Sequence, residues 1–312
     1  MQPKQKKISI IGAGSVGSSY AFSLMMSGIA REVVIVDINK KKAFGEALDL
    51  SHVQSFISPV EISYGNYEDI KDSDIVVITA GLNQKVNQSR LDLVKDNTKI
   101  FKEIIPKIAK NAPNSILIVV TNPVDVLSYV AYKISDFPKE KVIGSGTVLD
   151  SSRLRSLLSN FYKIDARNIH ANLIGEHGNT EFPVWSKANI SGIPFDKCNL
   201  IKYKKEDLEK IFEEVKNSAA KIIEAKGSTC YGIAISLLKI TKSILRDENS
   251  ILPVSSFIDN YLDVNDVYLS VPALIGSQGV KGILKMDLSN DEINNFHLTA
   301  KTIKDVIKQI GF

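Results

Sequence analysis

The sequence predicts an α/β protein, with a doubly wound parallel sheet in its first half and an α+β domain after it. Three observations lead to this fold class. Short runs rich in Ile and Val recur in the first half, segments with helical spacing separate them, and the alternation ends after about residue 150. Parallel strands need helix-sized connections, and helices on both faces of the sheet make each strand an almost continuous apolar run.

The first half follows this alternation in order. Strands are expected at residues 8–12, 33–37, 74–80, 116–121 and 141–144, with a helix over 18–26 after the first strand. The alternating part predicts one domain, residues 1–146, and leaves residues 147–312 for the second. No low-complexity linker separates them, so we expect the halves to pack together with a site at their junction.

The second half mixes helices and strands without a regular order. A helix is expected over 205–225, where Leu208, Ile211 and Val215 recur on one face, and a closing helix over 291–310. Strands are expected at residues 169–174, 266–272 and 282–288, the last two around a turn at 276–279.

The composition is that of a globular protein. Of 312 residues, 44% are apolar and 24% charged. The net charge of +4 comes largely from lysine clusters with which only Tyr203 interleaves, so we expect solvated surface and no nucleic-acid partner.

Cysteine use and hydropathy indicate the compartment. Cys198 and Cys230 are too few for a disulfide framework or a zinc site, and no metal is expected. No stretch approaches the roughly 20 apolar residues of a membrane span, and residues 1–7 run into a strand without an apolar stretch of signal-peptide length, so we expect no secretory signal. We therefore expect a cytoplasmic protein with free thiols and no membrane partner.

A glycine-rich loop joins the first predicted strand to the first helix. It reads Gly12-Ala13-Gly14-Ser15-Val16-Gly17, and Asp37 ends the next strand about 20 residues later. In a Rossmann-type domain, Gly12 allows the tight turn, Gly14 admits a dinucleotide pyrophosphate, and Gly17 lets the helix pack on the strand. Asp37 would accept hydrogen bonds from the adenosine ribose and repel a 2′-phosphate, which favours NAD. The alternative is a glycine-rich turn with a surface aspartate.

Two further polar segments follow predicted strands. They read Thr79-Ala80-Gly81 and Thr121-Asn122-Pro123. Open α/β sheets bind ligands at the carboxyl ends of their strands. Thr79 and Gly81 are therefore candidate cofactor contacts, and Asn122 is a candidate for the nicotinamide end of the cofactor.

A histidine stands in a glycine-bracketed turn, Gly175-Glu176-His177-Gly178-Asn179-Thr180. With an ordinary pKa of about 6.5, a histidine both donates and accepts a proton near neutral pH. His177 is therefore a candidate general acid and base, although such histidines also occur in plain turns.

Four segments together resemble a known family. They are the glycine loop, residues 84–93 (QKVNQSRLDL), residues 149–153 (LDSSR) and the turn at 175–178. Their order resembles the L-lactate and malate dehydrogenase superfamily from about residue 6 to the C-terminus, and within it the bacterial L-lactate dehydrogenases. The resemblance implies that the second half is a substrate domain and that hydride passes reversibly between NADH and pyruvate, giving L-lactate and NAD.

The resemblance also implies catalytic roles. His177 is the proton donor and acceptor, and Asp150 binds its other ring nitrogen, which favours the imidazolium. Arg153 anchors the substrate carboxylate with its guanidinium fork, and Arg90, on a closing loop, polarises the substrate carbonyl. Taken alone, Asp150 is more typical of a helix N-cap near Ser151, and both arginines are more typical of surface charges.

Further contacts come from the same resemblance. Thr229 lines the substrate pocket together with Asn122. The remaining cofactor contacts that it implies are Val16, Ser145 and Ile233.

Gln84 bears on the choice of 2-oxo acid. Malate enzymes of the superfamily carry an arginine at this place to pair with a second carboxylate, whereas Gln84 is neutral. Burying the second carboxylate of oxaloacetate against an amide costs on the order of several kcal/mol, so pyruvate is favoured. Val86, Asn87 and Gln88 depart from the usual bacterial loop after Lys85, which leaves open a tolerance for larger 2-oxo acids.

Arg155 and His170 coincide with a pair that binds fructose 1,6-bisphosphate in many bacterial lactate dehydrogenases, across a subunit interface of the tetramer. Cationic groups that face their symmetry mates repel until a polyanion bridges them. We therefore expect a homotetramer that this sugar bisphosphate activates. The alternative is that Arg155 lies on a helix surface and His170 is an ordinary, partly buried histidine.

Two other functions stay open. A malate or broader 2-hydroxy acid dehydrogenase would share the chemistry, and Gln84 argues against it. A non-catalytic NAD-binding protein would share the fold, because fold does not imply function. The joint presence of His177, Asp150, Arg90 and Arg153 argues against that alternative.

Overall fold

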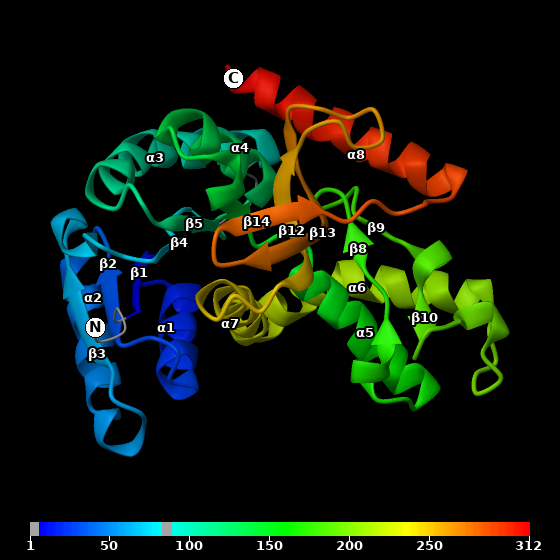
Figure 1. Cartoon of the computed structure of the whole chain (residues 1–312), viewed down its shortest axis with the longest axis horizontal. Helices are drawn as coiled ribbons and strands as arrows, with labels where there is room; N and C mark the ends of the chain where they lie inside the picture. Colours follow the sequence, from blue (N-terminus) through cyan, green and yellow to red (C-terminus); the bar gives the residue numbers. More distant parts are fainter. Residues whose placement is uncertain (1–5, 83–88) are drawn as a thin grey trace.

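The computed structural model describes residues 6–82 and 89–312, apart from the side chain of Arg90. Within these ranges a nine-stranded sheet crosses the molecule in the order β14-β13-β12-β6-β5-β4-β1-β2-β3 (Figure 1). Its parallel part consists of β1 (Lys7–Ile11), β2 (Glu32–Val36), β3 (Glu61–Gly65), β4 (Ile75–Ile78), β5 (Ile116–Val119) and β6 (Val142–Gly144).

Strands from the second half of the chain extend this sheet. They are β12 (Ser250–Ile258), β13 (Val267–Gly276) and β14 (Gly279–Ile283), and all three are antiparallel to their neighbours. Ser255 of β12 pairs with Gly144 of β6. The two halves therefore share one sheet, and they pack together as the sequence predicts.

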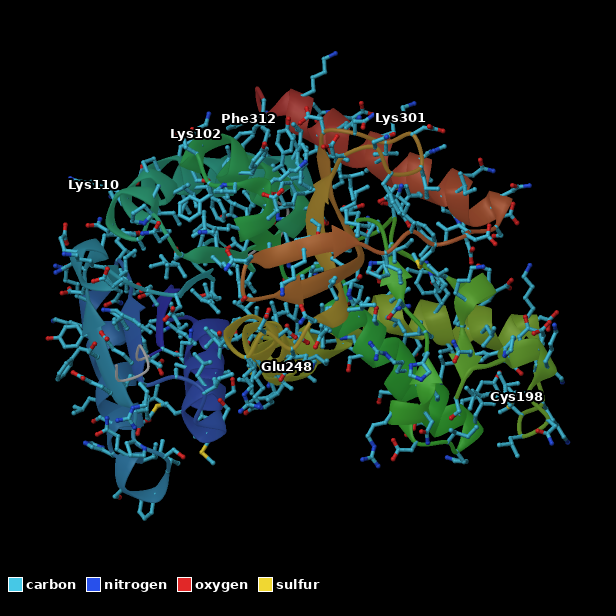
Figure 2. All side chains as sticks on the ribbon, in the orientation of Figure 1. Lys102, Lys110, Cys198, Glu248, Lys301 and Phe312 are labelled. Carbon is cyan, nitrogen blue, oxygen red and sulfur yellow. The ribbon has the colours of Figure 1, made fainter. Side chains whose placement is uncertain are left out.

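Helices cover both faces of the sheet. They are α1 (Ser15–Ser27), α2 (Lys40–Ser51), α3 (Arg90–Asn111), α4 (Val124–Ser135), α5 (Val148–Tyr162), α6 (Lys205–Lys226), α7 (Tyr231–Leu245) and α8 (Asn290–Gln309). Helices α3, α4 and α8 share a core with one face of the sheet, and α1, α2 and α7 share a core with the other. Figure 1 shows α3 beside α4 on one side and α1 beside α7 on the other. Near the C-terminus, the Lys102 ammonium lies 5.0 Å from the ring centroid of Phe312 (Figure 2).

The parallel strands are apolar throughout because their side chains alternate between these two cores. In β4, Val76 and Ile78 join the core of α3, α4 and α8, whereas Ile75 and Val77 join the core of α1, α2 and α7. Burial on both faces explains the continuous Ile and Val runs, and the predicted fold class is confirmed.

A third core lies between α5 and α6 and two small sheets. One sheet holds β7 (Ile169–His170), β10 (Asn189–Ile190) and β11 (Ile193–Pro194), and the other holds β8 (Leu173–Ile174) and β9 (Phe182–Pro183). Short 3₁₀ turns connect the elements at Gln54–Phe56, Tyr67–Ile70, Lys139–Lys141, Ala166–Asn168, Trp185–Lys187 and Phe195–Lys197.

Two strand predictions are wrong. The single strand expected at 169–174 is divided at Ala171 and Asn172, and β7 and β8 join different small sheets. The strand expected at 282–288 begins earlier, at Gly279, directly after the two-residue turn Ser277-Gln278, and ends at Ile283.

Two strands of the large sheet escaped prediction. Strand β3 lies at the sheet edge and is only partly buried, so it lacks a continuous apolar run. Strand β12 contains Pro253 and three serines. None of the described helices is long and apolar enough to cross a membrane.

Candidate active site

The glycine loop lies between β1 and α1, where the strand order reverses beside β4. Gly12 has a φ of 115°, a region that favours glycine, and a Cβ there would collide with Thr79 and Ala80. A Cβ at Gly17 would collide with the carbonyl oxygen of Gly12. Glycine at both positions therefore lets α1 and β4 approach the turn closely.

The N-terminus of α1 is open to an anion. Gly14 is its N-cap residue, no side chain caps the helix, and its first turn holds no acidic residue. A Cβ built on Gly14 would meet no described atom within 4 Å. This open space, with free N–H donors and the positive end of the helix dipole below it, fits a dinucleotide pyrophosphate. Val16 is partly buried within this first turn of α1.

Asp37 follows β2 and reaches the glycine loop. Its Oδ2 accepts a hydrogen bond of 2.6 Å from the backbone N–H of Ala13, and its Oδ1 accepts one of 2.7 Å from Asn39. Each carboxylate oxygen retains further acceptor capacity. Held against the turn in this way, Asp37 fits the ribose hydroxyls of a dinucleotide, and its charge disfavours a 2′-phosphate.

Thr79 and Gly81 lie at the carboxyl end of β4, on the same side as the glycine loop. The Thr79 hydroxyl donates to the carbonyl oxygens of Ile11 and Gly12, at 3.2 and 3.0 Å. A Cβ at Gly81 would collide with the Thr121 methyl group. These contacts hold the ends of three parallel strands together around the loop.

Asn97 of α3 is a site residue that the sequence did not reveal. It is fully buried, its Nδ2 donates to the carbonyl oxygen of Asn122 at 2.8 Å, and its Oδ1 accepts from the N–H of Leu82 at 2.7 Å. It therefore fixes Asn122 relative to the segment that precedes α3. An amide within the long helical stretch after residue 90 was its only signal.

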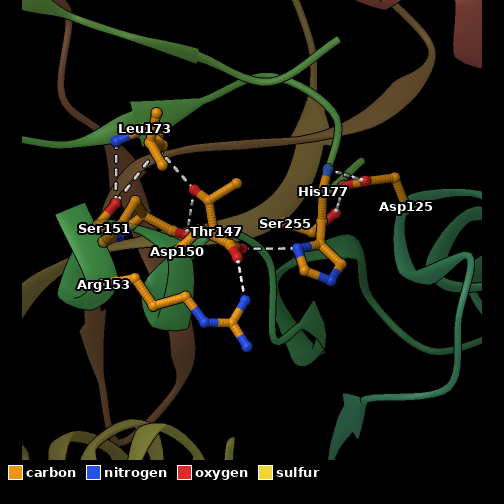
Figure 3. Close-up of polar contacts among 9 residues, drawn as sticks. Asp125, Thr147, Asp150, Ser151, Arg153, Leu173, His177 and Ser255 are labelled. Carbon is orange, nitrogen blue, oxygen red and sulfur yellow. Dashed lines mark hydrogen bonds and ion pairs between the residues drawn. The ribbon is translucent and has the colours of Figure 1, made fainter. Parts of the chain in front are cut away.

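His177, Asp150 and Arg153 form one hydrogen-bonded group (Figure 3). The Nδ1 of His177 lies 2.6 Å from Asp150 Oδ2, and Arg153 Nη1 donates to Asp150 Oδ1 at 2.8 Å. The Asp150 side chain is 5% exposed, that of Arg153 14%, and that of His177 26%. The carboxylate is thus buried beneath two cationic groups that keep access to solvent.

Helix α5 positions Asp150 and Arg153. Thr147 is its N-cap residue, so Asp150 lies inside the first turn and the interpretation of Asp150 as the N-cap is wrong. The Thr147 hydroxyl donates to the carbonyl oxygen of Leu173 at 2.6 Å, and Ser151 Oγ accepts from the Leu173 N–H at 2.9 Å. These bonds fix the start of α5 against the chain that leads to His177.

The loop of His177 is held by its backbone. Gly175, with a φ of 96°, exchanges two backbone hydrogen bonds with Ser270 of β13, at 2.9 and 2.8 Å. The Glu176 N–H donates to Thr299 Oγ1 at 2.8 Å, and the His177 N–H donates to Asp125 Oδ2 at 2.7 Å. The imidazole is therefore placed by a strand and two helices.

Asp125 is a second residue that the sequence did not reveal. It is 1% exposed in α4, and its Oδ1 accepts from Ser255 Oγ at 2.6 Å while Oδ2 accepts from His177. Burial raises the pKa of Asp125 to about 6 against these hydrogen bonds, which lower it. An acid within the apolar run Val124–Ser135 was the signal that could have found it.

The charge balance favours a protonated histidine. Burial lowers the pKa of His177, but the Asp150 carboxylate and its hydrogen bond outweigh this effect and raise the pKa to about 9. Burial acts to raise the pKa of Asp150, while His177 and Arg153 lower it below its ordinary value. The group can therefore hold a proton on His177 at neutral pH and release it to a developing oxyanion.

Glu181 is a third residue that the sequence did not reveal. It is 7% exposed, and Asp150, His177 and Glu181 place possible ligand atoms within 4.8 Å of one another. Asp150 is already bound by His177 and by Arg153. This arrangement indicates a cluster of interacting charges, and the absence of a metal stays a prediction.

The other predicted contacts lie around this group. Thr229 is half-buried between α6 and α7, and Ile233 is a partly buried residue of α7. The start of α7 packs against Leu149, next to Asp150. Ser145 is buried between β6 and α5, and its N–H donates to Val119 at 2.8 Å. Gln84 lies outside the described residues, and the structure describes only the backbone of Arg90, which starts α3.

Arg155 and His170 lie on two different elements, α5 and β7. Arg155 is partly buried on α5, and its Nε donates to the carbonyl oxygen of Ser151 at 3.1 Å. His170 is exposed on β7 and lines a cavity of about 380 Å³ together with Lys187. Among the described residues, Arg155 therefore keeps its Nη donors beyond the Nε hydrogen bond, and His170 is exposed to solvent.

Comparisons with known proteins cover almost the whole chain. Residues 6–144 match the family described as "lactate/malate dehydrogenase, NAD binding domain", and residues 147–311 match "lactate/malate dehydrogenase, alpha/beta C-terminal domain". The chain is 51% identical over 308 residues to the L-lactate dehydrogenase of Acetivibrio thermocellus, covering 98% of this chain and 97% of that one. It is 50% identical over 310 residues to L-lactate dehydrogenase 1 of Clostridium acetobutylicum, covering 98% and 99%.

Two solved structures are similar throughout. A lactate dehydrogenase from a Medee basin deep-sea metagenome library is 41% identical, with a TM-score of 0.94 and coverage of 99% of this chain and 100% of that one. The minor L-lactate dehydrogenase of Enterococcus mundtii, in a ligand-bound form, is 35% identical, with a TM-score of 0.95 and coverage of 98% and 99%. The prediction of NAD as cofactor is confirmed by the match to the NAD-binding domain.

Proposed function

Because the chain belongs to the lactate/malate dehydrogenase family, as its motifs predict, we propose that it is an NAD-dependent L-lactate dehydrogenase that interconverts pyruvate and L-lactate. The names of its relatives support this substrate pair. The observation that carries the mechanism is the buried Asp150, bound at once to His177 and to Arg153. The division into a cofactor domain at 1–146 and a substrate domain at 147–312 is part of the same proposal.

His177 and Arg153 divide the chemistry between them. NADH, when bound, supplies the hydride that reaches the carbonyl carbon of pyruvate. His177 gives the proton from its Nε2 to the carbonyl oxygen, while Asp150 holds Nδ1 and stabilises the imidazolium before the transfer. Arg153 binds the substrate carboxylate, and Arg90 polarises the carbonyl. In the reverse direction, neutral His177 takes the proton from the lactate hydroxyl.

The cofactor residues support this reaction with binding and orientation. The N-terminus of α1, opened by Gly14, holds the pyrophosphate, and Asp37 holds the adenosine ribose. Between the two ends, the cofactor would be held by Thr79, Gly81, Ser145 and Val16. Asn122 and Ile233 would hold the nicotinamide end. Thr229 lines the substrate pocket.

Substrate preference tests this proposal directly. We expect the wild-type protein to oxidise NADH with pyruvate at a kcat/KM about 10²-fold or more above that with oxaloacetate. Gln84 offers no charge to a second carboxylate, and a buried unpaired charge costs several kcal/mol, with each roughly 1.4 kcal/mol worth tenfold. Absorbance of NADH measures both rates. A preference for oxaloacetate would favour a malate or broader 2-hydroxy acid dehydrogenase, and no reduction of either would favour a non-catalytic NAD-binding protein.

A homotetramer in the cytoplasm, activated by fructose 1,6-bisphosphate, is the second part of the proposal. The partly buried Arg155 and the exposed His170 support it, since each leaves a cationic or titratable group that a polyanion at a subunit interface can neutralise. Sedimentation as a monomer would contradict the assembly.

Removal of these groups should abolish activation. In the double variant Arg155→Gln, His170→Asn, the ratio of pyruvate-reduction rates with and without fructose 1,6-bisphosphate is expected to fall to about 1, because the polyanion loses its cationic partners. Exposed Arg167 offers the control Arg167→Gln, which should keep the wild-type ratio. Equal activation of wild type and the double variant would show that the effector binds elsewhere.

A further inference from the structure

Glu181 is a buried acid that the proposed reaction does not use. It is 7% exposed, and its Oε2 lies away from solvent without a hydrogen-bond partner among the described residues. Its carboxyl group shares a region 4.8 Å across with ligand atoms of Asp150 and His177. A buried carboxylate without a partner is costly, and the cost falls when the group holds a proton.

Charged groups from helix α5 and from the loop that follows β8 act on this carboxyl group. Asp150 and Arg153 come from α5, and His177 and Glu176 come from the loop that follows β8. Asp125 of α4 acts on the same cluster through its electrostatic interaction with His177. Among the described side chains, two acids, Asp150 and Glu176, therefore oppose two cationic groups, His177 and Arg153, in their effect on Glu181.

The balance of these charges keeps Glu181 protonated at neutral pH. Burial, followed by the Asp150 charge, raises the pKa of Glu181 to about 8, against the opposing charges of His177 and Arg153. A neutral Glu181 carries no charge that would compete with an incoming substrate carboxylate for the Arg153 guanidinium. At higher pH Glu181 becomes an anion, and its charge then raises the pKa of His177.

We propose that Glu181 is a positioning residue that acts through His177: it is neutral while substrate enters, and as the pH rises it becomes the anion that holds the proton on His177. The inference rests on the proposed function, because it assigns Glu181 a part in the same proton transfer. Its consequence is a proton donor that works over a wider pH range than the Asp150 contact alone would give.

Titration of His177 tests this role without catalysis. We would label the ring carbons of the four histidines, assign His177 with the His177→Asn variant, and follow its signal with pH in wild type, Glu181→Gln and Glu181→Asp. The pKa of His177 is expected to fall by about one unit in Glu181→Gln, the lower range for an opposite charge at this separation, and to stay near wild type in Glu181→Asp. The control Glu248→Gln removes an acid just beyond the C-terminal end of α7 (Figure 2) and should leave the pKa of His177 unchanged.

Kinetics provide the second measurement. The alkaline limb of kcat/KM for pyruvate reduction should move to lower pH by the same amount in Glu181→Gln, while KM near pH 7 stays within about threefold of wild type, because amide and neutral acid carry the same charge. If Glu181 only packed against the loop, the Glu181→Gln variant would change KM or stability, and the pH of the alkaline limb of kcat/KM would stay unchanged.

Several outcomes would overturn the proposal. The first is an unchanged His177 pKa in Glu181→Gln, and the second is a fall of the His177 pKa in Glu181→Asp as large as that in Glu181→Gln. The third is a chemical shift of the Glu181 carboxyl carbon showing that this group is already ionised in wild type at about pH 6. The third measurement is made on the wild-type protein, so it does not depend on whether a variant folds. Failure of the wild type to reduce pyruvate would overturn the proposed function, whereas the two titrations would still decide the role of Glu181.

Discussion

The variant His177→Asn is expected to lower kcat for pyruvate reduction by about 10²–10⁴-fold, the range that a positioned general acid contributes. Asparagine keeps a donor for Asp150 but has no proton to transfer to the substrate oxygen. Steady-state oxidation of NADH at saturating pyruvate measures the loss, and a fluorescence titration with NADH shows whether the cofactor still binds. His297, which is exposed and binds the carbonyl oxygen of Leu262, gives the matched control His297→Asn with expected wild-type activity.

The pH dependence of the wild type follows from the same residue. Asp150, together with the charges of Glu181 and Asp125, raises the pKa of His177 to about 9, so the histidine carries the proton below that pH and loses it above. Pyruvate reduction needs the protonated form and should decline as the pH rises through about 9, whereas lactate oxidation needs the neutral form and should rise over the same range. A rate for His177→Asn within about threefold of wild type would remove His177 from the mechanism.

The variant Arg153→Gln is expected to reduce kcat/KM for pyruvate by about 10²–10³-fold, chiefly through a higher KM. The substrate carboxylate would enter a mostly buried site without its cation, and breaking such a pair costs roughly 3–5 kcal/mol. Arg153→Lys should retain part of the activity, because an ammonium keeps the charge and loses the fork. Initial rates over a range of pyruvate concentrations separate KM from kcat.

Asp150 complicates this variant, because Arg153 Nη1 donates to it at 2.8 Å. Loss of that bond would also act on His177, so a fall in kcat alone, with KM unchanged, would contradict the assignment of Arg153 as the carboxylate anchor. Exposed Arg167, paired with Asp165, is the matched control, and Arg167→Gln should retain wild-type values of both constants.

Local sequence was sufficient for the cofactor end of the molecule. One helix and one strand, α1 and β2, separate the glycine loop from Asp37, so regular geometry brings them together, and Asp37 accepts a hydrogen bond from the backbone N–H of Ala13. His177 and Asp150 are 27 residues apart in sequence, and the divided strand at 169–174 lies between them. Spacing alone does not place such a pair, and its prediction needed the resemblance to a family.

The roles of the buried polar residues could not be predicted from the sequence. Asp125 and Glu181 stand in or beside apolar stretches, whereas Asn97 stands in the polar run of residues 95–99, and in neither setting does spacing along the chain define a partner. The partners are set by tertiary structure: Asp125 meets Ser255 over a separation of 130 residues. The same limit applies to β12, whose serines and proline conceal a strand that only its pairing with β6 and β13 defines.

The pairing of β12 with β6 also bears on how the protein evolves and how it can be divided. A fragment that ends after residue 146 would leave β6 as an open edge, with unpaired N–H and C=O groups exposed to self-association. A chimera that takes its first half from a relative must therefore preserve the β6–β12 hydrogen bonds, the seam between the halves, as well as the packed surface between them. Ser255, which pairs with Gly144 at this seam, also binds Asp125, so a graft that disturbs the seam would reach the histidine loop through two hydrogen bonds.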